Sequence, residues 1–262
     1  MRVSRSKLRA AASTDVGRCR EHNEDTFLVR AEAAVFVVAD GMGGHESGDV
    51  ASAIVAQSIA GFFDGESSTP VAADLLQPDD SALPTGAVRL LAAVRQANRD
   101  VHQASLDSPS NRGMGSTVVA IHFADGGDLA FISHVGDSRC YRIRSGVIEL
   151  LTEDHSLINE ARAMDPSLSE EELARLPSNI ITRALGLEPS VQVDLRIVPV
   201  LAKDVFLLCS DGLSGLVSSR EMLEAVRLAD DLEEASELLV ALANDGGGYD
   251  NITALVVAPN GC

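Results

Sequence analysis

The stretch VFVVADGMGGH at residues 35–45 decides the fold class, because an apolar run of strand length ends directly on an acidic turn. The run is rich in β-branched residues and is bounded by Asp40 and Gly41, as strands commonly are. The same arrangement recurs in VFLLCSDG at residues 205–212. Both stretches predict a buried strand whose end carries a carboxylate.

Other apolar runs share this composition, and helical periodicity appears between them. Helices are expected at Ala51–Phe63, Ala87–Leu106 and Asp231–Ala243. The strands follow one another in runs and hairpins rather than in strict alternation with helices. We therefore predict an α+β fold in which helices pack on the outer faces of antiparallel sheets. The remaining predicted strands are Thr117–Phe123, Leu129–Val135, Tyr141–Ile143, Val147–Leu151, Val193–Val198 and Ile252–Val257.

The composition excludes several classes of partner. Of the 262 residues, 45% are hydrophobic, which is enough to form the core of one large domain. The net charge of −18 repels nucleic-acid phosphates and anionic lipids, and aromatic residues make up only 3% with no Trp. We therefore expect no nucleic-acid and no membrane partner. No coiled-coil pattern or large apolar stripe is visible, so we expect a monomer.

The chain shows no internal repeat, so we predict one domain over residues 13–258 after a basic segment at residues 1–12. The stretch Gly65–Pro84, rich in Ser, Pro and Asp, is expected to be loosely structured. No apolar run has the length of a signal peptide or a membrane span, and the four cysteines are scattered as free thiols would be. These features predict a cytoplasmic protein.

Four aspartates lie at the ends of predicted strands, namely Asp40, Asp137, Asp211 and Asp250. Taken singly, Asp-Gly and Asp-Asn pairs are ordinary turn formers. Four of them at strand ends indicate carboxylates that converge, and crowded carboxylates repel one another unless a divalent cation lies between them. An all-oxygen set favours Mg²⁺ or Mn²⁺ over zinc.

Two further stretches extend this site. In the glycine-rich loop after Asp40, the backbone can approach a ligand closely and offer a carbonyl oxygen, although a plain flexible loop is the alternative. The block REHNED at residues 20–25 places a guanidinium beside acids, and its planar fork matches two phosphate oxygens. Taken alone, this block is better read as a surface ion-pair patch.

Six stretches of the chain form a characteristic ordered set: residues 20–25, DGMGGH at 40–45, GMGST at 113–117, HVGDSR at 134–139, LCSDGL at 208–213 and DNIT at 250–253. In this order they resemble the metal-dependent serine/threonine protein phosphatases of the PP2C (PPM) family in their compact bacterial form. The resemblance implies a four-layer α-β-β-α sandwich, with two central antiparallel β-sheets flanked by helices and two metal ions at one end.

The resemblance also implies the metal ligands. Asp40 bridges the two ions, and Gly41 lends its backbone carbonyl to one of them. Asp211 and Asp250 complete the protein ligands of the other ion. Asp137, together with Asp211, serves a third, weaker site. The cofactor is expected to be Mn²⁺ or Mg²⁺, with two ions in each active site.

Further roles follow from the same resemblance. Glu24 and Asp25 act mostly through water molecules on the ions, and Arg20 holds the substrate phosphate. Animal members carry a His directly after Asp-Gly, and here that position is Met42. His45 is a candidate for the general acid, with a metal-bound water as the favoured alternative. Asp40, Asp211 and Arg20 are thus expected to carry catalysis.

The implied reaction is hydrolysis of phosphoserine and phosphothreonine in proteins by an activated water, opposing a bacterial Ser/Thr kinase. A silent phosphoprotein-binding module and a two-metal nuclease are the alternatives; the retained acids oppose the first and the acidic surface opposes the second. The segment Ser156–Ser178 falls where the family carries a flap, which gates substrate or is only a solvated helical hairpin. His102, His122 and His134 are expected to pack rather than to bind metal.

Overall fold

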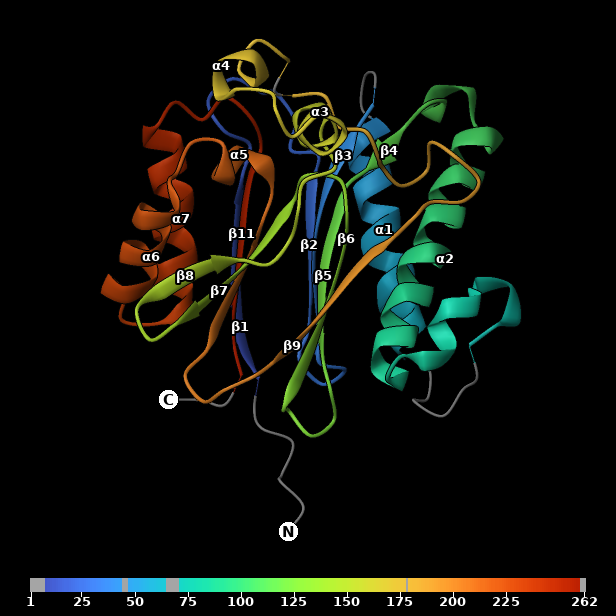
Figure 1. The fold of residues 1–262 in the computed structure, drawn as a ribbon, viewed down its shortest axis with the longest axis horizontal. Helices are drawn as coiled ribbons and strands as arrows, with labels where there is room; N and C mark the ends of the chain where they lie inside the picture. The colour runs from blue at the N-terminus through green and yellow to red at the C-terminus, as the bar shows by residue number, and fades with distance from the viewer. Residues whose placement is uncertain (1–7, 44–46, 65–70, 178, 260–262) are drawn as a thin grey trace.

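Two antiparallel β-sheets pack face to face, and helices cover the outer face of each (Figure 1). The computed structural model describes residues 8–43, 47–64, 71–177 and 179–259. The first sheet has the order β1 (Arg9–Asp15), β11 (Ile252–Ala258), β10 (Val205–Cys209), β7 (Arg139–Arg144) and β8 (Val147–Leu150). The second has the order β2 (Asp25–Arg30), β3 (Val35–Met42), β5 (Val118–Phe123), β6 (Leu129–Val135) and β9 (Asp194–Pro199), with β4 (Gly115–Ser116) pairing to β3.

Each sheet has its own helical cover. The second sheet packs against α1 and α2, and the first packs against α6 and α7, so the predicted four-layer α+β sandwich is confirmed (Figure 1). The short α5 follows β10, and α3 and α4 lie at one end of the sandwich. The helices are α1 (Ser47–Asp64), α2 (Thr85–Asp107), α3 (Leu157–Met164), α4 (Glu170–Leu173), α5 (Asp211–Ser214), α6 (Ser219–Leu228) and α7 (Leu232–Asp245). None of the described helices is long and apolar enough to cross a membrane.

The central position of β3 explains its continuous apolar sequence. Phe36 and Val38 point into the core between the two sheets, whereas Val35, Val37 and Ala39 point into the core beneath α1 and α2. All five side chains are fully buried. A strand that is covered on both faces has no solvent side, so the polar half of the usual alternation is missing.

The sheets contain three strands that the sequence analysis did not predict, β1, β2 and β4. β1 pairs along its whole length with β11, from Arg9 opposite Ala258 to Asp15 opposite Ile252. The sheet therefore begins at Arg9, earlier than the boundary placed at residue 13. Its sequence, RAAASTD, contains Thr14 as its only β-branched residue, and its place in the sheet comes from the partner strand.

The stretch Gly65–Pro84 is more ordered than expected over the residues that the structure describes. Two short 3₁₀ helices occupy Ala73–Leu75 and Pro78–Ala82. The buried Asp80 forms an ion pair with Arg95 of α2, and Arg95 also donates a hydrogen bond to the carbonyl oxygen of Leu75 at 2.9 Å. These long-range contacts fix a segment whose composition alone indicates a loop.

Candidate metal centre

One end of the sandwich, drawn uppermost in Figure 1, contains a polar pocket of about 290 Å³. Seven chain segments contribute to it, and all four strand-end aspartates lie in its wall. The structure thus brings together the residues that sequence analysis selected one by one. The residues that line the pocket are Arg20, Glu24, Asp40, Gly41, Met42, Gly43, Thr117, Asp137, Asn179, Ile181, Asp211, Asp250 and Asn251.

Asp40 and Gly41 are held by backbone contacts at the end of β3. The amide of Asp40 donates to Oγ1 of Thr117 at 3.2 Å, and the amide of Thr117 donates to the carbonyl oxygen of Asp40 at 2.8 Å. A Cβ at Gly41 would lie 1.9 Å from the carbonyl oxygen of Gly48. Only glycine permits the start of α1 to approach β3 this closely.

A second close approach joins Asp211 to Asp250. Asp211 is the first residue of α5, and Asp250 precedes β11, which pairs with β10. A Cβ at Gly212 would lie 2.0 Å from the carbonyl oxygen of Asn251, so the two loops meet backbone to backbone. The side-chain atom Oδ1 of Asp211 has no hydrogen-bond partner among the described residues.

Asp25 forms the floor of the cluster. It lies opposite Asp40 in the β2–β3 ladder and is 7% exposed. Its Oδ2 accepts hydrogen bonds from the hydroxyl groups of Ser210 and Thr253, both at 2.7 Å. Its Oδ1 is buried and has no partner among the described residues. Sequence analysis gave no role to Ser210, which directly follows β10, or to Thr253, which lies within β11, because an isolated hydroxyl residue at such a position is common.

The crowding of these acids disturbs their protonation. Burial, together with the charges of neighbouring carboxylates, raises the pKa of Asp40 well above its usual value and also raises those of Asp25 and Asp211. Burial and the charge of Asp211 raise the pKa of Asp137 to about 7. Buried carboxylate oxygens without donors, in a group that resists ionisation, are the environment that a divalent cation stabilises. The donor set fits Mg²⁺ or Mn²⁺.

Arg20 and Glu24 border the acids. Arg20 Nη2 donates to Oδ2 of Asp250 at 2.7 Å and leaves the rest of its guanidinium fork at the pocket. Oε1 of Glu24 accepts a hydrogen bond from the amide of Gly48 at 3.2 Å, at the start of α1. Burial is the largest cause of the raised pKa of Glu24. Arg20 is therefore the one cationic residue in the lining of this pocket, whose other charged residues are acidic.

Asn251 organises the segment that carries these two residues, a role that sequence analysis missed. Its Nδ2 donates to the carbonyl oxygens of Val16 and His22 at 3.0 and 2.9 Å, and its Oδ1 accepts from the amide of Glu24 at 2.8 Å. All of the Asn251 side chain is thus occupied in shaping residues 16–24. The only available signal was an Asn beside a strand-end Asp, which turns alone explain.

The histidines occupy other places. His45 lies outside the described residues. His102, His122 and His134 each form a hydrogen bond with a backbone carbonyl, those of Gly186, Ala34 and Glu153 respectively. None of the three lines the acidic pocket.

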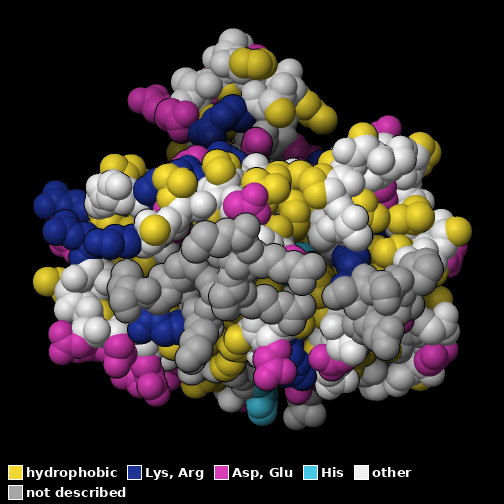
Figure 2. All heavy atoms as spheres, turned by 90° about the horizontal axis from the view of Figure 1, so that it is seen from below, with side chains coloured by type: hydrophobic (Ala, Val, Ile, Leu, Met, Phe, Trp, Pro, Cys, Tyr) yellow, Lys and Arg dark blue, Asp and Glu magenta, His cyan; other side chains and the backbone are white. Residues whose placement is uncertain are grey.

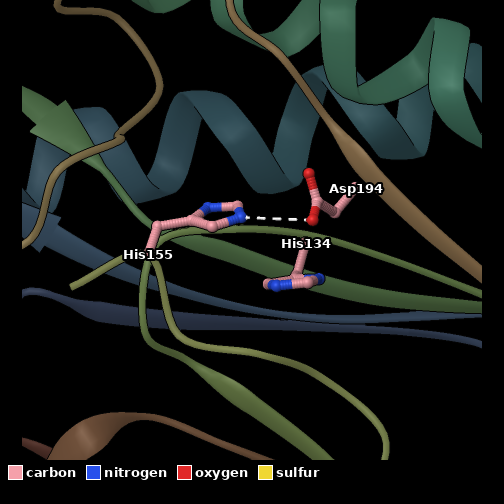
Figure 3. Close-up of side chains that lie close together, drawn as sticks. All are labelled: His134, His155 and Asp194. Atoms are coloured by element: carbon pink, nitrogen blue, oxygen red, sulfur yellow. Dashed lines mark ion pairs between the residues drawn. The ribbon is translucent and has the colours of Figure 1, made fainter. Parts of the chain in front are cut away.

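His134, His155 and Asp194 form a separate cluster (Figure 3), and His155 directly precedes Ser156, the N-cap of α3. The two rings stack at 4.8 Å, and Nδ1 of His155 accepts from the amide of Gly136 at 3.1 Å. That hydrogen bond places the proton of the neutral ring on Nε2, which lies 3.5 Å from Oδ2 of Asp194 and 3.2 Å from the guanidinium of Arg183. A protonated nitrogen beside a cation opposes metal binding. The cluster instead fastens the chain just before residues 156–178.

The comparisons with known proteins agree with this geometry. The family model described as protein phosphatase 2C matches residues 18–253. A serine/threonine phosphatase (stp) of Listeria innocua is 35% identical over 256 residues, which is 97% of this chain and 96% of that protein.

Solved structures give the same result. The crystal structure of the Mycobacterium tuberculosis serine/threonine phosphatase PstP/Ppp superposes with a TM-score of 0.82 at 35% identity, covering 97% of this chain and 99% of that one. A structure of the PstP catalytic domain in complex with two manganese ions superposes with a TM-score of 0.79 at 36% identity, with the same coverage. The chain belongs to the protein phosphatase 2C family.

Proposed function

We propose that this protein hydrolyses phosphoserine and phosphothreonine in proteins, using two Mn²⁺ or Mg²⁺ ions held by the acidic pocket. The observation that carries the proposal is the convergence of Asp40, Asp137, Asp211 and Asp250 around buried carboxylate oxygens that lack donors. The relatives named above are serine/threonine phosphatases, and one of their structures contains two manganese ions.

The residues divide into ligands and supports. Asp40 would bridge the two ions, with the carbonyl oxygen of Gly41 on one and Asp211 and Asp250 on the other. Asp137 lies in the same wall and would serve a third, weaker ion together with Asp211.

Glu24 and Asp25 lie behind these ligands. Asp25 is buried and receives two hydroxyl donors, and Glu24 is tied to the start of α1, so both would act through water rather than directly.

The chemistry rests on charge and position. Two divalent cations, when bound, supply an activated water nucleophile and stabilise charge on the phosphoryl oxygens. Arg20 offers its remaining N–H groups to the phosphate, and its hydrogen bond to Asp250 orients the guanidinium. The net charge of −18 repels a phosphoprotein at long range, so binding depends on this local positive charge. A water molecule is the favoured general acid in this proposal, and His45 is the other candidate.

The decisive experiment is a panel of phosphoserine, phosphothreonine and phosphotyrosine peptides, assayed with Mn²⁺, with Mg²⁺ and with EDTA. We expect turnover of the first two peptides, loss of activity in EDTA, and a decrease on the order of 10³-fold in Asp211→Asn. Asp230→Asn, at an exposed position away from the pocket, is the matched control and should keep wild-type turnover. Activity that survives thorough chelation would contradict the proposal.

The proposal also covers the compartment, the oligomeric state and the partner of the protein. We place the protein in the cytoplasm, as a monomer that opposes a Ser/Thr kinase. The buried Cys140 and Cys209 are free thiols, which suits a reducing compartment. Size-exclusion chromatography with light scattering tests the monomer, and dephosphorylation of a co-expressed Ser/Thr kinase tests the partner.

The segment 156–178 is proposed as a flap. It contains α3 and α4, and the next described residues, Asn179 and Ile181, line the acidic pocket. Movement of this segment would therefore change one wall of the pocket.

A further inference from the structure

A second pocket, of about 280 Å³, lies at the end of the second sheet opposite the acidic pocket. Its walls come from the β2–β3 turn, the β5–β6 turn and the first turn of α2. Figure 2 views the molecule from this end, where Asp and Glu side chains are spread over the described surface. The pocket shares no lining residue with the acidic pocket.

Arg89 is the unusual feature of this second pocket. It lines the pocket, is only 9% exposed, and its guanidinium lies 5.2 Å from the ring centre of Phe63. Within the described ranges, neither a carboxylate nor a carbonyl group forms an ion pair or hydrogen bond with it. The five N–H donors of the guanidinium therefore have no acceptor in the described part of the chain, and an anion in the pocket would accept hydrogen bonds from them.

The first turn of α2 offers further donors to the same space. The helix begins after Pro84, whose side chain cannot cap it, and no described acceptor meets the amide groups of Thr85 and Gly86. Thr85, Gly86 and Arg89 all line the pocket, and Thr85 and Arg89 lie one helical turn apart. The positive end of the helix and the guanidinium therefore act on the same volume.

The start of α2 also packs closely against the wall of the pocket. A Cβ at Gly86 would lie 2.6 Å from Cε2 of Phe131, so the glycine brings the backbone amides against an aromatic surface. Phe63 and Phe131 form apolar walls of the pocket. A ligand must therefore combine an anionic group with an apolar body.

The remaining polar groups limit the charge of that ligand. His122 bonds to the carbonyl oxygen of Ala34 through Nδ1 at 3.0 Å, and burial lowers its pKa, so the neutral ring leaves Nε2 as an acceptor. Glu32 and Asp125 also line the pocket and repel a multiply charged anion.

We propose that this pocket binds a small organic monocarboxylate. The carboxylate lies between Arg89 and the amides of Thr85 and Gly86, and the apolar body rests on Phe63 and Phe131. A hydroxyl group on the ligand would donate to Nε2 of His122. The volume of about 280 Å³ accommodates a single ring or a short aliphatic chain.

Calorimetric titration of the Mn²⁺-loaded protein with 4-hydroxybenzoate and hexanoate tests the proposal, with benzyl alcohol as the neutral control. We expect both carboxylates to bind and the alcohol not to bind. Arg89→Met should weaken carboxylate binding at least about tenfold. Arg99→Met removes the same charge from the same helix at a site outside the pocket and should leave the affinity unchanged.

A second measurement locates the ligand without any variant. In the wild-type protein, the amide resonances of Thr85 and Gly86 should shift during titration with 4-hydroxybenzoate. Shifts confined to the surroundings of Asp40 and Asp211 would place the ligand at the metal centre and overturn the proposal. Equal affinity in wild type and Arg89→Met, or no binding by either carboxylate, would also overturn it. Should Arg89→Met not fold, Arg89→Lys keeps the charge but loses the fork, and should still weaken binding severalfold.

Discussion

The two ends of β3, Val35 and Met42, lie about 23 Å apart and differ in the charged side chains around them. At one end, Asp40 joins other carboxylates around a pocket with one cationic side chain, Arg20. At the other end, Ala34 borders a pocket of similar volume that contains one buried cation, Arg89. At the first end, Oδ1 of Asp25 and Oδ1 of Asp211 have no hydrogen-bond partner among the described residues. At the second, Arg89 contacts the ring of Phe63 and forms no ion pair with any described residue.

This comparison separates buried charges that are paired within the chain from buried charges that are expected to bind a ligand. Elsewhere in the fold, buried charges are paired within the chain, as Arg144 is with Asp204 and Arg95 with Asp80. Such pairs need no ligand, because each desolvated charge already has its counter-charge. The two pockets depart from that pattern in opposite directions, so a cation is expected at one and an anion at the other.

The largest expected effect concerns α2. This helix carries Arg95, which is paired with Asp80, and Arg89, which has no ion-pair partner among the described residues. Arg95→Met leaves Asp80 buried without its partner and should cost about 3–5 kcal/mol in the free energy of unfolding. Arg89→Met removes a buried cation that has no partner among the described residues, and should leave the stability of the ligand-free protein unchanged or raised. Urea unfolding of both variants measures the difference; a similar loss in both would show that Arg89 is structural.

The second prediction concerns how the acidic pocket makes stability depend on pH. The folded-state pKa of Asp137 is raised to about 7, and those of Asp25, Asp40 and Asp211 are also raised above their unfolded values near 4. The folded protein then binds more protons than the unfolded chain between about pH 4 and 7, so the metal-free protein should lose stability as the pH rises through that range.

Added Mn²⁺ should offset this loss, with an increase in Tm on the order of 5 °C that is larger at pH 8 than at pH 5. Thermal unfolding in EDTA and in Mn²⁺ at the two pH values is the measurement. An equal increase in Tm at both pH values would mean that the folded-state pKa values of these acids are not raised.

The smallest effect concerns the cluster beside the flap. Burial lowers the folded-state pKa of His155 to about 4, against an unfolded value near 6.5. The unfolded chain binds the extra proton in this window, so stability contributed by neutral His155 is complete above pH 6.5 and is lost as the pH falls towards 4. In Mn²⁺-loaded protein, the decrease in Tm between pH 6.5 and 4.5 should be shallower in His155→Gln than in wild type. Parallel curves for the two proteins would exclude this role.

Much of the fold could be predicted from local pattern. The runs at residues 35–39 and 205–209 became central strands because both faces of each are covered, and the hairpin around Ser145 and Gly146 follows from residues that accept positive φ angles of 51° and 79°. β1 could not be predicted in this way, because RAAASTD is a strand only through its pairing with β11. The ion pair between Arg95 and Asp80, which orders the segment before α2, likewise joins residues that no local pattern connects.

The sequence by itself determined the chemistry of the metal centre and the family, because acids that follow apolar strands are local signals with few alternative explanations. Only the tertiary structure decided that Asp25 is the buried floor, that Asn251 shapes residues 16–24, and that Arg89 lines a pocket at the start of α2. Each of these facts depends on which distant groups share a volume after folding. Burial and pairing are properties of that shared volume, and no periodicity along the chain encodes them.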